Sequence, residues 1–190
     1  YMKKIQEFSE YNLRNLGKMN HVNDGTRSLF ESILPVEVID ALHDWIENND
    51  TKCVLIGGLA LSYYIKPRYT SDVDVLFLSK NDIPNEVYKF KHHRPSAYQH
   101  NKTHVEVEAV TPELINTTID TIQAVFDTAK DVDGIKVASP SALIALKLGR
   151  FSRQDQADIE GLTQFVGYNN VDLEPFKLSQ ELLNKYIEFK

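Results

Sequence analysis

Cysteine is almost absent from this sequence, and its scarcity excludes two kinds of stabilising site. The 190 residues contain a single cysteine, Cys53, so neither an internal disulfide nor a zinc cluster built on cysteines can form. Cys53 opens an apolar run and is interpreted as a small buried hydrophobic side chain. The start of the chain has no secretory signal pattern. We therefore expect a protein of the reducing cytoplasm.

Long apolar runs and an excess of positive charge are also missing. No run approaches the roughly 18–20 residues that a helix needs to cross a bilayer, so we expect no membrane association. Acidic residues (27) outnumber Lys and Arg (21), and the net charge of −6 argues against a protein that coats nucleic acid non-specifically. The 42% of hydrophobic residues is ordinary for a globular domain with a substantial core.

One stretch, Val54–Phe77, carries the features that point to chemistry. A short apolar run ends at Gly57 and Gly58, which let an anion approach the backbone at the start of a helix. Asp72 and Asp74 lie two apart in the returning strand, so both carboxylates leave the same face. Their repulsion favours a bound cation, and hard oxygen ligands suit Mg²⁺ bridging to a substrate phosphate.

These residues resemble the core of the polymerase-β-like nucleotidyltransferase superfamily. The resemblance rests on Gly57-Gly58 followed by the run Arg68-x-Thr70-x-Asp72-x-Asp74. It is strongest to small bacterial or phage members, including the toxins of type IV abortive-infection systems. It implies an α/β (α+β) fold in which a mixed-sheet nucleotidyltransferase core, residues 51–138, lies between an N-terminal helical extension, 1–50, and a C-terminal helical region, 139–190.

The phosphate turn departs from the usual superfamily pattern. Many members have Gly-Ser there, with the serine hydroxyl on the triphosphate, whereas Gly58 and Leu59 follow Gly57 in this chain. The contact would then fall to backbone amides or to Ser62. The resemblance also implies that Arg68 supports the phosphates and that the cofactor is Mg²⁺ or Mn²⁺.

A third carboxylate is expected from a neighbouring strand. The run Val-Glu-Ala-Val-Thr around Glu108 is similar to the hydrophobic-acid-hydrophobic run of the small bacterial branch, and Glu106 lies two residues earlier on the same face. Glu108 is the first candidate and Glu106 the second. The alternative is that both are solvated glutamates of an ordinary strand.

A second motif follows in the C-terminal region. Lys147 and the later run Arg-x-Asp-x-x-Asp-Ile, with Asp155 and Asp158, are similar to a helical motif of the same branch, where the lysine meets the phosphates of the nucleotide. The alternative is a salt-bridged seam between two helices.

Four histidines lie in the basic stretch from Lys89 to Lys102 and just beyond it. They are His92, His93, His100 and His104. Their spacing does not enforce a zinc site. The stretch is either a solvated loop or a surface for a phosphate-bearing acceptor, with Tyr98 available for stacking.

Hydrophobic periodicity and turn residues predict the secondary structure. Strands are expected at 53–56, 73–78, 97–100, 103–110 and 134–138. Helices are expected at 2–16, 35–48, 59–65, 82–91, 115–129, 139–151, 153–166 and 179–189, and a short helix or turn at 28–34.

The sequence thus predicts a metal-dependent nucleotidyltransferase that transfers a nucleoside monophosphate from a nucleoside triphosphate. The expected acceptor is RNA or tRNA, a protein side chain or a small molecule. The resemblance extends to a toxin-like role with an antitoxin partner. The rival is a nucleotide-binding or regulatory module that has lost its chemistry: Gly58 in place of serine and glutamate as third acid favour it, while intact Asp72 and Asp74 oppose it.

Overall fold

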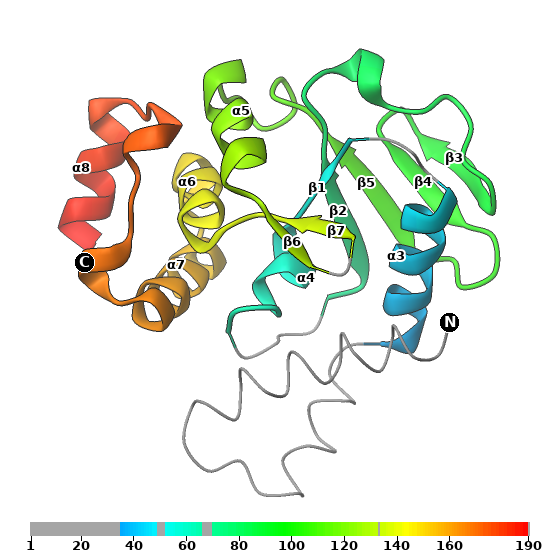
Figure 1. Cartoon of the computed structure of the whole chain (residues 1–190), viewed down its shortest axis with the longest axis horizontal. Coiled ribbons are helices and arrows are strands. Elements are labelled where there is room, and N and C mark those ends of the chain that lie inside the picture. The colour runs from blue at the N-terminus through cyan, green and yellow to red at the C-terminus, as the bar shows by residue number, and fades with distance from the viewer. Residues whose placement is uncertain (1–34, 49–51, 66–69, 133, 190) are drawn as a thin grey trace, which may run out of the picture.

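The computed structural model describes residues 35–48, 52–65, 70–132 and 134–189, and within them a seven-stranded mixed sheet forms the centre of the molecule (Figure 1). The strand order is β3-β4-β5-β2-β1-β7-β6. The strands are β1 (Val54–Ile56), β2 (Asp72–Leu76), β3 (Phe90–Arg94), β4 (Ala97–His100), β5 (Glu106–Val110), β6 (Lys130–Val132) and β7 (Ile135–Val137). This architecture confirms the α/β class expected from the sequence.

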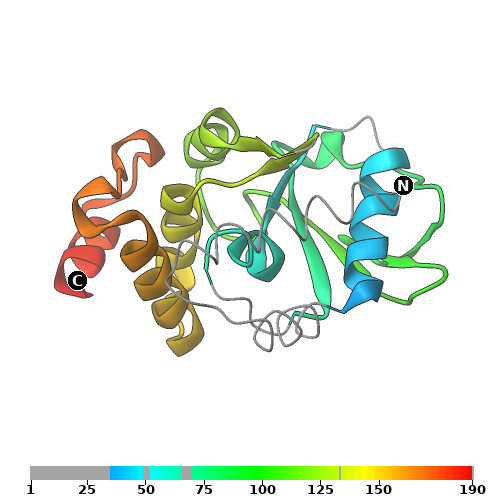
Figure 2. The same cartoon turned by 60° about the horizontal axis from the view of Figure 1, so that its bottom comes forward.

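Six α-helices and three short 3₁₀ helices accompany the sheet in the described ranges. They are α3 (Val36–Asn48), α4 (Gly57–Leu61), α5 (Ile119–Thr128), α6 (Pro140–Arg150), α7 (Arg153–Val166), α8 (Gln180–Phe189), η1 (Lys80–Asp82), η2 (Tyr168–Asn170) and η3 (Glu174–Phe176). Helices α5 to α8 gather at one side of the molecule and α3 at the other, with the short α4 between them (Figures 1 and 2). Of the described helices, not one has the length and apolar character needed to cross a membrane.

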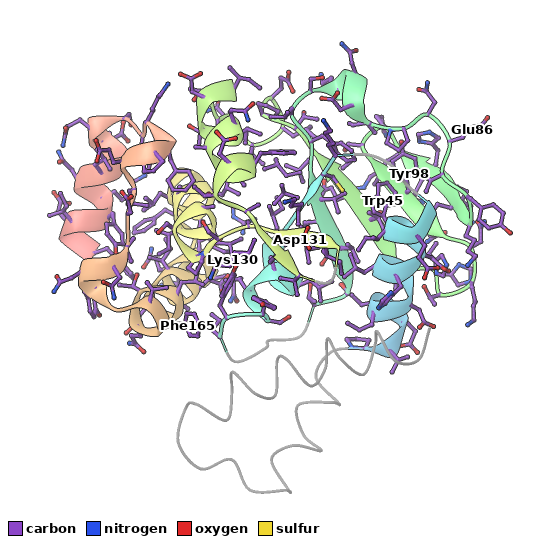
Figure 3. All side chains as sticks on the ribbon, viewed as in Figure 1. Trp45, Glu86, Tyr98, Lys130, Asp131 and Phe165 are labelled. Carbon is purple, nitrogen blue, oxygen red and sulfur yellow. The ribbon has the colours of Figure 1, made fainter. Side chains whose placement is uncertain are left out.

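Helix α3 covers one face of the sheet because its apolar residues repeat at helical spacing. Val38, Leu42 and Trp45 are buried, as the sequence predicted for a helix at 35–48. The indole of Trp45 packs edge-on against Phe90 and Tyr98, with ring centroids 5.4 and 5.2 Å away (Figure 3). The aromatic contacts join α3 to the β3–β4 hairpin.

The α6–α7 pair begins and ends where its capping residues predict. Ser139 accepts a hydrogen bond from the amide of Ala142 and Pro140 occupies the first turn of α6. Phe151, with φ of 52°, ends α6, and Ser152 starts α7 with a capping box to Asp155. The helices expected at 139–151, 153–166 and 179–189 are confirmed within two residues.

The helix expected at 82–91 is wrong. Only the single turn η1 forms, and the chain then enters β3, which pairs antiparallel with β4. Pro84 disfavours helical conformation at Ile83, and Lys89 takes a positive φ of 69°, which no helix contains. Hydrogen bonds to β4, which local periodicity does not encode, then select the strand.

Two further expectations need smaller corrections. The helix predicted at 115–129 begins only at Ile119, because Thr118 caps it and Asn116 has a positive φ of 48°. Strand β6, missing from the expectation, forms a hairpin with β7. The helix expected at 2–16 and the short helix or turn expected at 28–34 lie outside the described residues, and the domain boundaries at 50 and 138 stay predictions.

Candidate active site

Four carboxylates lie on one face of the sheet where β2 and β5 run side by side. The strands are parallel, with Asp72 opposite Glu106 and Asp74 opposite Glu108. Paired residues on adjacent strands project to the same face at a separation of about 4.8 Å. All four residues are half-buried, whereas Val73 and Val107, on the opposite face, are fully buried. The tertiary structure thus joins the predicted acids of two strands into one acidic face.

Gly57 lies directly against Asp74. A Cβ atom added at Gly57 would lie 1.7 Å from Oδ2 of Asp74, and the residue has a φ of +67°. Both the space and the backbone conformation therefore require glycine. Gly58, which follows in α4, is buried. The predicted glycine turn and the predicted acid are brought into contact, so the strand–turn–helix unit and the return strand form one site.

Thr70 fixes the orientation of Asp72. Its hydroxyl donates a hydrogen bond of 2.9 Å to Oδ1 of Asp72, and the threonine is 5% exposed. A buried donor of this kind holds one carboxylate oxygen and leaves the other directed elsewhere. Thr70 is thereby a positioning residue of the acidic face.

Arg94 of β3 binds the two glutamates of β5. Its guanidinium donates two hydrogen bonds to Glu106, and its Nη1 lies 3.6 Å from Oε1 of Glu108. The hydrogen bond from Arg94 lowers the pKa of Glu106, against the opposing effect of burial, and His93 at 3.7 Å adds to the lowering. Glu106 thus makes the closer contacts with Arg94, and Glu108, the register partner of Asp74, lies within ion-pair distance of the same guanidinium.

Arg150, at the end of α6, is bound to Asp155 and lies close enough to Asp74 for the two charges to interact. Its Nε and Nη2 donate to the two oxygens of Asp155 at 2.7 and 2.8 Å. The hydrogen bond to Asp155 raises the pKa of Arg150, and the negative charge of Asp74 contributes as well. The side chain is nevertheless 73% exposed. An exposed guanidinium that is anchored on one edge can bind an anion with the other.

Lys147 lies in the seam between α6 and α7. Its ammonium is 2.7 Å from Asp158 and 3.3 Å from Asp155, and its side chain is 10% exposed. Burial raises the pKa of Asp155, but hydrogen bonds from Arg150 and Ser152 and the charge of Lys147 outweigh it and lower the pKa. The geometry matches the seam interpretation, and contact of Lys147 with a nucleotide stays a prediction.

The remaining predicted site residues are not all brought to this face. The hydroxyl of Ser62 donates to the carbonyl of Leu59 at 2.6 Å, and the serine is 3% exposed. Its hydroxyl is therefore used within the turn of α4. Arg68 lies outside the described residues.

The basic stretch is neither a free loop nor a stacking surface at Tyr98. Tyr98 is 2% exposed and its hydroxyl donates to the carbonyl of Pro84, so the expected stacking role is wrong. His100 is also buried, between Asp44 at 2.9 Å and Thr103 at 2.7 Å. The other three histidines of this group are exposed, His92 and His93 on β3 and His104 in the segment before β5. The hairpin packs its aromatic face against α3, which local sequence does not reveal.

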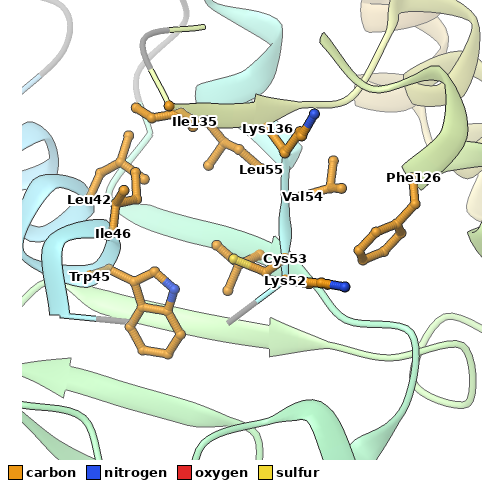
Figure 4. Close-up of a pocket in the computed structure, with 12 residues that line it drawn as sticks. Leu42, Trp45, Ile46, Lys52, Cys53, Val54, Leu55, Phe126, Ile135 and Lys136 are labelled. Atoms are coloured by element: carbon orange, nitrogen blue, oxygen red, sulfur yellow. The ribbon is translucent and has the colours of Figure 1, made fainter. Parts of the chain in front are cut away.

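A separate pocket of about 500 Å³ is lined by residues of α3, β1, α5 and β7 (Figure 4). It is lined mainly by apolar side chains, including Leu42, Trp45 and Leu55, with Lys52 and Lys136 at its rim. None of the residues that line it was predicted as a site residue. Its lining offers no carboxylate, so we do not place the chemistry there.

The donor set of the acidic face suits a hard divalent cation. Asp74 and Glu108 present oxygen ligands from directly paired positions, and Mg²⁺ prefers such ligands. In the described part of the chain, no three His, Cys, Asp or Glu side chains already stand close enough to hold a metal ion.

A mixed sheet that carries paired acids beside a glycine turn defines, with the sequence motif, the class of nucleotidyltransferases. The chain belongs to the family described as nucleotidyltransferase of unknown function (DUF6036), whose model matches residues 36–180. At that level the resemblance found in the sequence is confirmed, while the likeness to type IV toxins stays a prediction. No curated protein matches the chain.

Sequence reasoning did not single out Arg94 and Arg150, which the structure places against the glutamates of β5 and against Asp155. Arg150 lies one helical turn after Lys147, so the two cations share a helix face and both contact Asp155. Arg94 belongs to the basic stretch. Because a helix was expected at 82–91, the β3–β4 hairpin that brings Arg94 close to β5 was not predicted.

Proposed function

We propose that this protein is a metal-dependent nucleotidyltransferase that moves a nucleoside monophosphate from a nucleoside triphosphate to an acceptor hydroxyl. The observation that carries the proposal is the parallel register of β2 and β5, which sets Asp74 opposite Glu108 on one face. Membership of a nucleotidyltransferase family supports the same reaction class.

Three carboxylates would hold Mg²⁺ or Mn²⁺ in this proposal: Asp72, Asp74 and Glu108. Two features support the choice of Glu108 over Glu106: Glu108 is the register partner of Asp74, and Glu106 is hydrogen-bonded to Arg94. When bound, the metal supplies positive charge to the reacting phosphate and lowers the pKa of the attacking hydroxyl.

Arg150 is the residue we propose for the phosphates on the Asp74 side. Its exposed guanidinium is oriented by buried Asp155, which also contacts Lys147. The backbone at Gly57 and Gly58, together with Arg68, remains proposed for the triphosphate.

The chemical step is an in-line displacement at the α-phosphorus. The acceptor oxygen forms a bond to phosphorus, the bond to the β-phosphate oxygen breaks, and pyrophosphate leaves with the electron pair. The hydroxyl proton passes to a carboxylate of the acidic face or to water. The nucleoside triphosphate and the acceptor hydroxyl therefore account for all atoms and charges of the products, and no further reactant is needed.

The deciding experiment offers the protein each α-labelled nucleoside triphosphate with a cell lysate, with and without Mg²⁺ or Mn²⁺. We expect metal-dependent label on RNA, protein or a small molecule. The double variant Asp72→Asn/Asp74→Asn should lose both labelling and metal-dependent triphosphate binding, while its circular dichroism stays parental. A double variant that binds the metal–triphosphate complex like the parent would remove the metal assignment.

A second candidate function is a nucleotide-binding or regulatory module without chemistry. The contact of Arg94 with Glu108 favours it, because the third acid is already paired. Triphosphate binding without label transfer to any lysate component would support this function. The toxin-like role has its own readout: expression of the parent, but not of the double variant, should arrest growth.

A further inference from the structure

Arg94 reaches the acidic face across an intervening strand. The register places Arg94 opposite Ala97 of β4, and Ala97 in turn opposite Glu108. Alanine has no side chain beyond Cβ, so the arginine stem can pass over β4. Its guanidinium then lies at β5, bound to Glu106 and 3.6 Å from Glu108. Because Ala97 is small and Arg94 is long, the positive charge of a residue on the edge strand β3 reaches the glutamates of β5.

A local irregularity in the pairing of β3 with β4 affects the direction of the Arg94 side chain. The pairing of β3 with β4 shifts between His92 and Arg94. A shift of this kind redirects the side chains around it. Here Arg94 and His93, successive residues that would alternate in a regular strand, both approach Glu106.

The charge of the face depends on this arginine. Four carboxylates gather there, from Asp72 and Asp74 on β2 and from Glu106 and Glu108 on β5. Arg150 already forms a bidentate pair with Asp155, whereas Arg94 has both glutamates of the face as its partners. Glu106 makes the closer contacts, so it anchors the guanidinium beside Glu108.

A fixed positive charge next to a metal position has opposite effects on two ligands. A bare divalent ion is repelled by the guanidinium, and it also competes with it for Glu108. A divalent ion that carries a triphosphate has a net negative charge, so the same guanidinium attracts the complex and can donate to a phosphate oxygen.

We propose that Arg94, anchored by Glu106, makes the acidic face select a metal–triphosphate complex over the bare metal ion. The inference rests on the proposed function and gives Arg94 a role in specificity that is separate from the metal ligands. It also gives Glu106 a role, as the tether of Arg94.

The test is calorimetric and needs no turnover. Mn²⁺ alone and the preformed Mn²⁺–tripolyphosphate complex are each titrated into the parent and into Arg94→Met, which keeps an apolar stem and removes the charge. We expect the variant to bind bare Mn²⁺ about fivefold tighter and the complex about fivefold weaker, as removal of one close charge predicts. A structural role alone would move both affinities in the same direction.

Lys91→Met is the matched control. Lys91 is an exposed cation of the same strand, but its register partner is Gln99 rather than Ala97. We expect this variant to keep the parental ratio of the two affinities, and Arg94→Lys to recover part of it. Equal shifts in Lys91→Met would mean that net charge alone acts, and this would overturn the proposal.

The outcomes separate this inference from the proposed function. A parent that binds both probes, with Arg94→Met at the parental ratio or weakened for both, overturns the inference and leaves the nucleotidyltransferase proposal in place. A folded parent that binds neither probe overturns both. Opposite shifts in Arg94→Met, with Lys91→Met unchanged, support both.

Discussion

Two independent features of the structure require glycine at position 57. Its φ of +67° disfavours any side chain, and its Cβ position coincides with the carboxylate of Asp74. We expect Gly57→Ala to lower the free energy of unfolding by about 1–3 kcal/mol from backbone strain, and to displace Asp74 as well. Urea denaturation measures the first effect, and Mn²⁺ titration measures the second.

Gly149→Ala serves as the control for that substitution. Gly149 lies near the end of α6, and an added Cβ would meet no atom within 4 Å. Since alanine favours helix over glycine, the variant should be as stable as the parent or gain up to about 1 kcal/mol. Equal losses in both variants would contradict the close approach of Gly57 and Asp74.

The two glutamates of β5 should differ in their effect on transfer. Glu108→Gln removes the proposed third acid, so we expect single-turnover transfer to fall on the order of 10²-fold while triphosphate binding is largely kept. Glu106→Gln leaves the partner of Asp74 in place and releases Arg94, so its transfer rate should fall less. The reverse ranking would move the site by one residue pair along the strands.

At the scale of elements, the α6–α7 seam depends on a buried ion cluster. Lys147→Met leaves Asp155 and Asp158 buried without their ammonium partner, and breaking such a pair costs about 3–5 kcal/mol. We therefore expect a lower melting temperature, with a single-turnover rate per folded molecule close to that of the parent. Arg153→Met, at an exposed position at the start of α7, is the control and should leave both unchanged.

Two results would contradict that expectation in different ways. A parental melting temperature with a much slower single-turnover rate would support direct contact of Lys147 with the nucleotide. A loss of both in Arg153→Met would show that the start of α7 tolerates no substitution, so that the variants could not be compared.

At the scale of the whole molecule, buried carboxylates join elements on both sides of the sheet. Asp44 of α3 is bonded to Lys89 and His100 of the hairpin, and Asp155 joins α6 to α7. Burial raises the pKa of each carboxyl, but the hydrogen bonds from their partners outweigh it and lower both pKa values.

Lowered pKa values predict the direction of acid unfolding. The two carboxylates stabilise the fold fully above the unfolded pKa of about 4, and this contribution is lost as the pH falls toward their folded values. We expect the free energy of unfolding to fall steadily below about pH 5. Urea denaturation from pH 7 to pH 3 should show a flatter slope for Asp44→Asn, and an unchanged slope would contradict the assignment.

Local chemistry was sufficient for much of the fold and for part of the site. The period of two in a strand places Asp72 and Asp74 on one face whatever surrounds them, and Ser139-Pro140 begins a helix through groups within its own first turn. The limits of α3 and α7 followed in the same way from apolar spacing and caps.

Only the tertiary structure decided which residues meet. Glu108 rather than Glu106 opposes Asp74 because of the register between two strands some thirty residues apart, and register depends on packing on both faces of the sheet. Arg94 comes within reach of both glutamates through β4, where its register partner Ala97 is in turn paired with Glu108. Such pairings join segments distant in the chain, where the spacing of residues carries no information about the partner.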